Sequence, residues 1–220
     1  MTNVLLSWSS GKDSAWALHL LSRRPDVRVC ALVTSFHSAD DRVAMHAVRR
    51  SLVEEQARQT GLPLWPVELP WPCPNAAYEE SLRPVFQRAR DEGITAMAFG
   101  DLFLQDIRRY RERQLVGTGL EALFPIWDLP TGALASDMID AGVKAKIICI
   151  DSSKLPASAA GREYDRAFLD ELPAGVDPCG ENGEFHTFVY ESPMFSAPIQ
   201  VRTGETVERA GFWFADVCGV

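Results

Sequence analysis

The chain has 220 residues, of which 46% are hydrophobic, enough to bury the core of one medium domain or of a core domain with a smaller addition. Its formal net charge of −8 at pH 7 repels nucleic acid unless basic residues cluster locally, so a nucleic-acid partner is not expected. No apolar run approaches the roughly 18 residues of a membrane span, and no signal peptide precedes the first strand pattern, so we expect a cytoplasmic protein with no membrane partner.

Strand-like and helix-like segments alternate over the first 150 residues. Apolar runs predict strands at Asn3–Leu6, Val27–Val33, Leu64–Leu69, Thr95–Phe99 and Val143–Ile150. Helical patterns lie between them, at Asp13–Leu21, from Asp40 to Gly61, from Asn75 or Pro84 to Gly93, at Leu104–Leu115 and at Thr131–Ala141. This alternation predicts an α/β fold, with a five-stranded parallel Rossmann-like sheet and helices on both of its faces.

The pattern changes after about residue 151, where turns separate shorter segments. Tyr164–Leu172 predicts a short helix, and Phe185–Tyr190, Ile199–Arg202 and Phe212–Val217 predict short strands. We therefore expect an α/β domain over residues 1–125 and a smaller α+β subdomain over residues 126–220 that continues the sheet and packs on its carboxyl edge. An edge strand of this subdomain could support a homodimer.

The loop that joins the first predicted strand to the first helix has the composition of a phosphate site. It reads Ser7-Trp8-Ser9-Ser10-Gly11-Lys12-Asp13-Ser14, and a helix N-terminus favours phosphate through its free N–H groups and its dipole. Gly11 lets the backbone come close, serine hydroxyls can donate, Lys12 supplies a point charge, and Asp13 could orient the Mg²⁺ that arrives with ATP. The loop is not a Walker motif, because Leu6 and Asp13 stand where that motif has glycine and Ser or Thr. A serine-rich helix cap is the structural alternative.

Ligands of parallel α/β folds bind at the carboxyl ends of the strands. Besides the phosphate loop, Thr34 follows the second predicted strand and Gly100-Asp101 follows the fourth. These positions are further candidates for the ligand site.

A second unusual segment, Asp177-Pro178-Cys179-Gly180-Glu181-Asn182-Gly183-Glu184-Phe185-His186-Thr187-Phe188, forms a glycine-rich turn before a strand. Glu181 and Glu184 could bind an ammonium nucleophile, hold Mg²⁺ or act as a base, and His186 could move a proton near neutral pH. A polar β-turn with solvated acids is the alternative that the residues alone leave open.

The two motifs together resemble one protein family. The segment from Ser9 to Ser14 resembles the SGGKDS motif of the PP-loop ATP pyrophosphatases, with Ser10 in place of the first glycine. The run GENGEFHTFV, with Ser192-Pro193-Met194-Phe195 after it, resembles the signature of the diphthine–ammonia ligase branch. Further similar stretches bring the resemblance to nearly the whole chain; they are Met45–Arg49, Gln56–Leu64, Phe99–Leu102 and Phe124–Trp127.

The resemblance implies a HUP-type fold and an enzyme that uses ATP and Mg²⁺ to adenylate a carboxylate, releases pyrophosphate and transfers ammonia. The acceptor implied is diphthine, a modified histidine on translation elongation factor 2. With the positions at the strand ends included, the nucleotide-binding candidates are Ser7, Ser9, Ser10, Gly11, Lys12, Asp13, Ser14, Thr34, Gly100 and Asp101, and Asp13 is the candidate metal ligand. The catalytic candidates are Lys12, Asp13, Glu181, Glu184 and His186, and the substrate-binding candidates are Arg111, Asn182, Gly183 and Thr187.

Two other functions compete with this hypothesis. A PP-loop tRNA-modifying enzyme is disfavoured by the net charge and by five dispersed cysteines that form no CxxC pair. A nucleotide sensor without acyl chemistry would have no use for a second reactive cluster. The sequence leaves open whether His46 and the arginine run from Arg108 to Arg113 are functional or structural.

Overall fold

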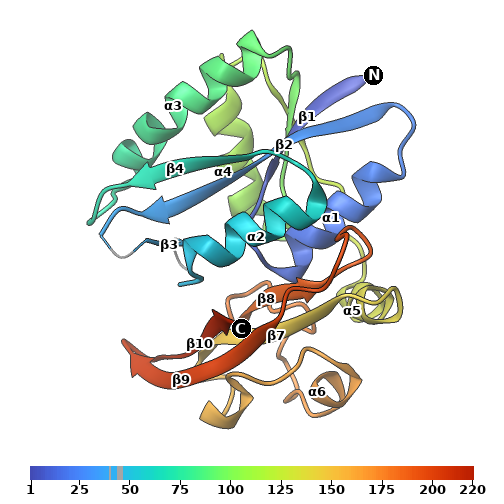
Figure 1. The fold of residues 1–220 in the computed structure, drawn as a ribbon, viewed down its shortest axis with the longest axis vertical. Helices are drawn as coiled ribbons and strands as arrows, with labels where there is room; N and C mark the ends of the chain where they lie inside the picture. The colour runs from blue at the N-terminus through green and yellow to red at the C-terminus, as the bar shows by residue number, and fades with distance from the viewer. Residues whose placement is uncertain (40, 44–46) are drawn as a thin grey trace.

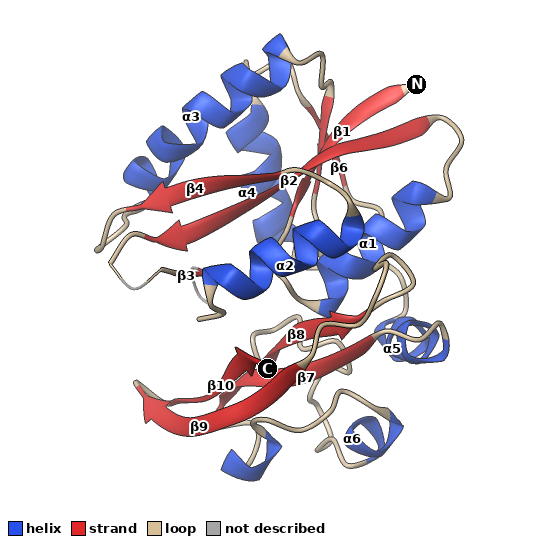
Figure 2. Cartoon of the chain, in the orientation of Figure 1, coloured by secondary structure: helices blue, strands red, loops and turns tan. Residues whose placement is uncertain are grey.

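The computed structural model describes residues 1–39, 41–43 and 47–220. Figure 1 shows two lobes, each built on one sheet, with the first lobe formed by the N-terminal half of the chain. Helices and strands alternate in the first lobe, whereas strands dominate the second (Figure 2). The first lobe contains β1 (Thr2–Ser7), α1 (Lys12–Ser22), β2 (Val27–His37), β3 (Arg42–Val43), α2 (Arg50–Thr60), β4 (Leu64–Leu69), α3 (Asn75–Asp91), β5 (Ala96–Ala98), α4 (Gln105–Leu115) and β6 (Glu121–Leu123). The second contains α5 (Thr131–Asp140), β7 (Lys144–Asp151), a 3₁₀ turn (Ala157–Ala159), α6 (Arg166–Asp170), β8 (Phe185–Glu191), β9 (Val201–Arg209) and β10 (Phe212–Gly219).

The first sheet is parallel except for β3. Strand β1 lies between β2 and β5, β4 pairs with β2, β6 pairs with β5, and the short β3 is antiparallel to β2. Successive side chains of β1 point to opposite faces, so Val4 and Leu6 join one core and Leu5 joins the other. Helices α1 and α2 cover the first of these faces, and α3 and α4 cover the second (Figure 1). The predicted α/β fold with helices on both faces is therefore confirmed.

The second sheet is antiparallel, in the order β8-β7-β10-β9. The strand predicted at 143–150 forms as β7, but it lies in this sheet, and placing it in the parallel sheet was wrong. The fifth parallel strand is β6 instead. In β7 the exposed Lys144 and half-buried Lys146 alternate with the buried Ala145 and Ile147, as in a sheet with one wetter face. The three residues of β6 carry too weak a pattern to be predicted.

Three other segments differ from their predicted bounds. The helix expected from Asp40 begins at Arg50, after β3, and residues 40 and 44–46, including His46, lie outside the described part of the chain. Helix α3 begins at Asn75 and continues through Pro84. The strand expected at Ile199–Arg202 is the longer β9, which forms a hairpin with β10.

The two lobes are joined by an ion cluster and by packing. Helix α1 packs against β8, so the helix lies between the two sheets (Figure 1). Asp216 of β10 accepts from Arg42 at 3.0 Å and from Arg49 at 2.5 Å. Burial raises the pKa of Asp216, but these guanidinium donors outweigh it and hold the pKa at about 2. The charged cluster thus remains intact across the physiological pH range.

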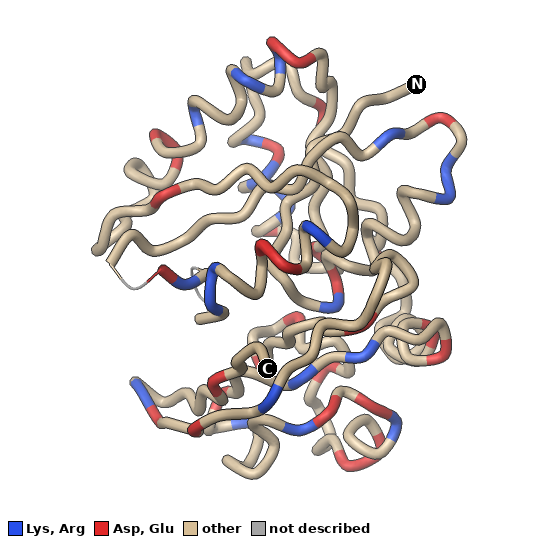
Figure 3. Tube along the Cα trace, viewed as in Figure 1, with Lys and Arg blue, Asp and Glu red and all other residues tan. Residues whose placement is uncertain are grey.

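Basic and acidic positions are interspersed through both lobes (Figure 3), and many of the arginines pair with a carboxylate. No helix in the described ranges has both the length and the apolar composition needed to cross a bilayer.

Candidate functional site

A cavity of about 210 Å³ lies where the loop after β1, the loop after β5 and the turn before β8 meet. Because β1 and β5 are parallel neighbours, their carboxyl ends lie side by side at this edge of the sheet. The second lobe supplies the opposite wall. The lining residues are Ser7, Ser9, Gly11, Lys12, Asp13 and Ser14; Phe99, Gly100, Asp101 and Arg111; and Cys179, Gly180, Glu181, Phe185, His186 and Thr187.

The phosphate loop ends at the first turn of α1. Gly11 has extended backbone angles and caps the helix, which begins at Lys12. The Ser14 hydroxyl donates to the Gly11 carbonyl at 2.9 Å, and the Lys12 N–H donates to Oγ1 of Thr187 at 3.0 Å. Thr187 therefore joins the β8 strand of the second lobe to the start of this helix.

Glycine at position 100 lets two loops approach each other. A Cβ on Gly100 would lie 3.0 Å from the carbonyl carbon of Asp13 and 3.0 Å from the backbone nitrogen of Ser14. The first turn of α1 and the end of β5 are thus in van der Waals contact through their backbones. This close approach places Asp101 at the mouth of the phosphate loop.

Lys12 is buried, with 2% of its side chain exposed. Its ammonium group donates to both oxygens of Asp13, at 2.8 and 3.0 Å, and to the carbonyl oxygen of Cys179. The rings of Tyr164 and Phe185 lie 5.5 and 5.4 Å from the nitrogen. Burial lowers the pKa of Lys12, but Asp13, Cys179 and Asp177 together raise it above its ordinary value, so the ammonium stays charged.

Asp13 occupies the opposite end of this ion pair. Burial raises its pKa, and the attraction of Lys12 only partly offsets that effect. Asp13 shares the cavity with Asp101, which pairs with Arg111 at 3.4 Å. The guanidinium carbon of Arg111, on α4, also lies 5.0 Å from the centre of the Phe99 ring, so this ring and Asp101 together hold the side chain in place.

Two other arginines of the run on α4 make ion pairs outside the cavity. Arg108 pairs with Glu112 and lies over the rings of Phe124 and Trp127, and Arg109 pairs with Asp106. Of this run, Arg111 is the residue that lines the cavity.

Several predicted site residues do not line this cavity. Ser10 is buried with a φ of 70°, and its carbonyl accepts the Val189 N–H at 3.0 Å. The Thr34 hydroxyl donates to the Trp8 carbonyl at 2.7 Å. Glu184, Asn182 and Gly183 belong to the same turn as Glu181 but do not line the cavity; Glu184 is buried and bonds to Asn182, which is exposed. The structure therefore brings together most, but not all, of the predicted set.

Gln56 of α2 is a site-supporting residue that the sequence prediction did not single out. It is fully buried, its amide nitrogen donates to the carbonyls of Ser10 and Val189 at 3.0 and 2.6 Å, and its oxygen accepts from the Trp8 indole at 2.8 Å. These bonds tie the phosphate loop to β8. An amide on the apolar stripe of a helix, beside Leu52 and Val53, is the sequence signal that could have revealed it.

We expect Gln56→Leu to lower the free energy of unfolding by about 2 kcal/mol, because it leaves the Trp8 indole N–H and the Val189 carbonyl buried without a partner. Urea unfolding of the variant measures this loss. Glu54→Gln on the exposed face of the same helix is the matched control and should unfold like the parent. An unchanged midpoint in Gln56→Leu would show that the network contributes nothing to stability.

The donor set of the cavity fits a magnesium nucleotide better than a resident metal. Among the described residues, no group of three or more His, Cys, Asp or Glu side chains could hold a metal ion by itself. Mg²⁺ is commonly held by one or two carboxylates together with substrate phosphates, and Asp13 and Asp101, now paired with Lys12 and Arg111, are the carboxylates of the first lobe that line the cavity. Lys12 and the N-terminus of α1 supply the positive end that phosphates require.

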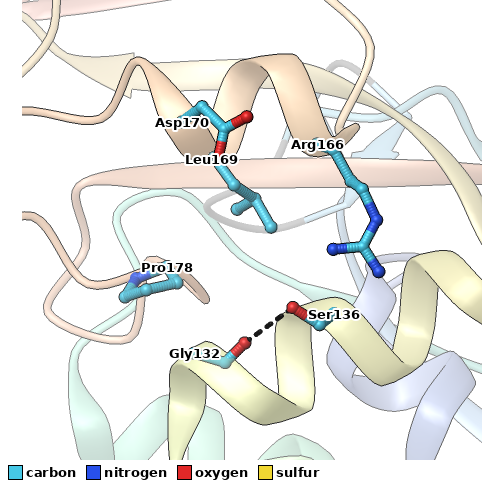
Figure 4. Close-up of a pocket in the computed structure, with 6 residues that line it drawn as sticks. All are labelled: Gly132, Ser136, Arg166, Leu169, Asp170 and Pro178. Carbon is cyan, nitrogen blue, oxygen red and sulfur yellow. Dashed lines mark hydrogen bonds between the residues drawn. The ribbon is translucent and has the colours of Figure 1, made fainter.

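A second cavity, of about 150 Å³, lies between α5 and α6 (Figure 4). Two of its polar side chains have local partners: the Ser136 hydroxyl donates to the Gly132 carbonyl, and Arg166 pairs with Asp140. It contains none of the residues predicted for a site.

Comparisons with known proteins agree with these motifs. The diphthamide synthase N-terminal domain matches residues 2–121, and the diphthamide synthase C-terminal domain matches residues 130–218. The diphthine–ammonia ligases of Bos taurus and Homo sapiens are each 32% identical over 144 residues, which cover 63% of this chain and 52% of theirs. That of Danio rerio is 27% identical over 230 residues, which cover 95% of this chain and 90% of the relative.

The chain thus spans about half the length of the mammalian relatives that it matches. Among solved structures, the U34-tRNA thiolase NcsA from Methanococcus maripaludis, with its [4Fe-4S] cluster, aligns with a TM-score of 0.40 and 16% identity over 63% of this chain and 56% of that one. The family domains, in contrast, match both lobes in order, and the first alone covers more than half of the chain. This protein belongs to the diphthamide synthase family.

Proposed function

We propose that this protein is an ATP-dependent, AMP-forming amide ligase that adenylates a carboxylate and transfers ammonia to it. The observation that carries the proposal is the meeting of two motifs in one cavity. The phosphate-binding start of α1 forms one wall, and the acidic turn before β8 forms the other. A nucleotide sensor would need only the first wall.

In this proposal the β- and γ-phosphates of ATP bind at the N-terminus of α1, where Gly11, Lys12 and Ser14 line the cavity and the positive end of the helix dipole favours anions. Magnesium arrives with the nucleotide and is held by Asp13, with Asp101 near it. The acceptor carboxylate attacks the α-phosphorus and pyrophosphate leaves. The acyl adenylate then reacts with ammonia on the side formed by Glu181, His186 and Thr187.

Diphthine on translation elongation factor 2 is the acceptor that we propose. The relatives that match most of this chain carry the name diphthine–ammonia ligase, and both family domains bear the name diphthamide synthase. Arg111, which lines the cavity beside Asp101, is the candidate to receive the acceptor or the adenylate phosphate.

With ATP labelled at the α-phosphate, Mg²⁺, ammonium and diphthine-bearing elongation factor 2, the purified protein should release labelled AMP and pyrophosphate and convert the factor to its amide. Separation of the nucleotides and mass measurement of the factor provide the readout. Elongation factor 2 that lacks diphthine is the control, and with it the protein should release no labelled AMP. ADP as the nucleotide product, or bound ATP that stays intact with the acceptor present, would contradict the proposal.

A further inference from the structure

The two glutamates of the turn before β8 lie in different surroundings. Glu181 lines the cavity, whereas Glu184 is 2% exposed and lies behind it. Gly180 and Gly183, both with positive φ, reverse the chain between them. The structure therefore separates two carboxyl groups that the sequence presents as equivalent.

Glu181 reaches across from the second lobe to the first. Its Oε1 accepts the backbone N–H of Leu102 at 2.8 Å and, more weakly, that of Phe103 at 3.4 Å. Both contacts use the same oxygen, which leaves Oε2 for a donor inside the cavity. This carboxyl group is consequently both anchored and available.

Glu184 and Asp177 use their oxygens within the turn itself. Glu184 accepts from the backbone N–H groups of Asp177 and Asn182, at 3.1 and 3.0 Å, and from the Asn182 amide at 3.0 Å. Asp177 accepts from the backbone N–H groups of Cys179 and Glu181, at 3.2 and 3.0 Å. These two buried carboxylates fix the backbone that carries Glu181.

We propose that Glu181 takes the proton from the attacking ammonia, and that Asp177 and Glu184 are positioning residues that act through it. This assignment rests on the proposed ligase reaction. A general base must lie within hydrogen-bond reach of the proton that it accepts, and among the three carboxyl groups Glu181 is the one that faces the cavity.

The step conserves atoms and charge. The nitrogen lone pair of ammonia forms the C–N bond at the acyl carbon, and one N–H proton passes to the Glu181 carboxylate. The bond between the acyl carbon and the phosphate oxygen breaks, and AMP leaves with that electron pair. The products are the primary amide, AMP and protonated Glu181, which returns its proton to solvent.

The surroundings of Glu181 suit this task. Burial raises its pKa to about 7, the carboxylates of Asp13 and Asp101 add to the rise, and the N–H groups of Leu102 and Phe103 oppose it. Lys12, Arg111 and His186 also line the cavity, and Asp177 lies behind it. The basic form is the carboxylate, so the rate per neutral ammonia should rise with pH as Glu181 loses its proton and then level off.

The test compares Glu181→Gln with Glu184→Gln in two assays. Acceptor-dependent exchange of pyrophosphate into ATP reports adenylation, and amide formation reports the whole reaction. We expect Glu181→Gln to keep the exchange rate near the parent level but to lower the rate of amide formation by about 10²-fold. The rise of that rate with pH should also disappear in this variant. Glu184→Gln should slow amide formation but keep the rise of its rate with pH, because Glu181 is still present.

His186 is another group in the cavity that could carry a proton, and His186→Gln tests it. This variant should also keep the rise of the amide-formation rate with pH. Amide formation at the parent rate in Glu181→Gln, or equal loss of exchange and amide formation, would overturn the assignment. A parent protein that shows no exchange would instead refute the ligase reaction itself, so the two failures are distinguishable.

Discussion

Replacing Lys12 by methionine is expected to lower kcat/KM for ATP by roughly 10²–10³-fold, the scale observed when one electrostatic stabiliser of a transition state is removed. Methionine fills most of the volume between Tyr164 and Phe185 but carries no charge. The buried ammonium is the cation nearest to the start of α1, and the leaving pyrophosphate gains negative charge there as the bond to the α-phosphorus breaks. Loss of this charge therefore raises the barrier to adenylation.

The measurement is the steady-state rate of AMP release at varied ATP, together with acceptor-dependent pyrophosphate exchange. Lys154→Met is the control, because Lys154 is exposed and lies outside the cavity. The kcat/KM of Asp13→Ala for ATP should fall by a similar factor, since Asp13 holds the Lys12 ammonium at 2.8 Å and is the proposed magnesium ligand. Unchanged AMP release in both Lys12→Met and Asp13→Ala would refute the role of this loop in ATP use.

Lys12 also joins the two walls of the cavity. Its ammonium contacts Asp13 on the phosphate-loop side and the Cys179 carbonyl on the turn side. Lys12 thereby links the start of α1 to the turn that carries Glu181.

Most of the fold could be predicted because its signals are local. Alternating apolar runs located β1, β2 and β4 to within a few residues, and the run at 143–150 was recognised as a strand. Its partners could not be read from it, since a strand's own pattern does not say which sheet it joins. The three-residue β6 shows the same limit, because its place depends on pairing with β5.

The site residues, too, could be predicted where local sequence determines their position and not where long-range contacts do. Residues whose neighbours are close in sequence, such as Gly11 and Lys12, were placed in the cavity by the motif alone. Glu184 could not be, because its direction depends on the left-handed glycines on either side of Glu181. Gln56 gained its role from partners 46 and 133 positions away in the chain. Long-range hydrogen bonds of this kind leave only a faint trace in sequence.

Gly180→Ala should lower the free energy of unfolding by about 2–5 kcal/mol, the sum of a left-handed backbone penalty and steric overlap. Gly180 has a φ of 71°, and a Cβ on it would lie 2.7 Å from the Phe185 carbonyl oxygen and 3.1 Å from its ring. Gly183→Ala is the matched control. Its φ is 85° with no atom within 4 Å, so it should lose only about 1–2 kcal/mol. Urea unfolding of both variants isolates the steric part.

Gly180→Ala and Gly183→Ala should also differ in their effect on activity. The Phe185 ring that the new methyl group would displace lies 5.4 Å from the Lys12 ammonium, so Gly180→Ala should disturb adenylation as well as amide formation. Gly183→Ala leaves that ring in place and should retain pyrophosphate exchange. Equal losses of stability in the two variants would mean that the turn relaxes around the methyl group, and that its shape is not held by the contact between Gly180 and Phe185.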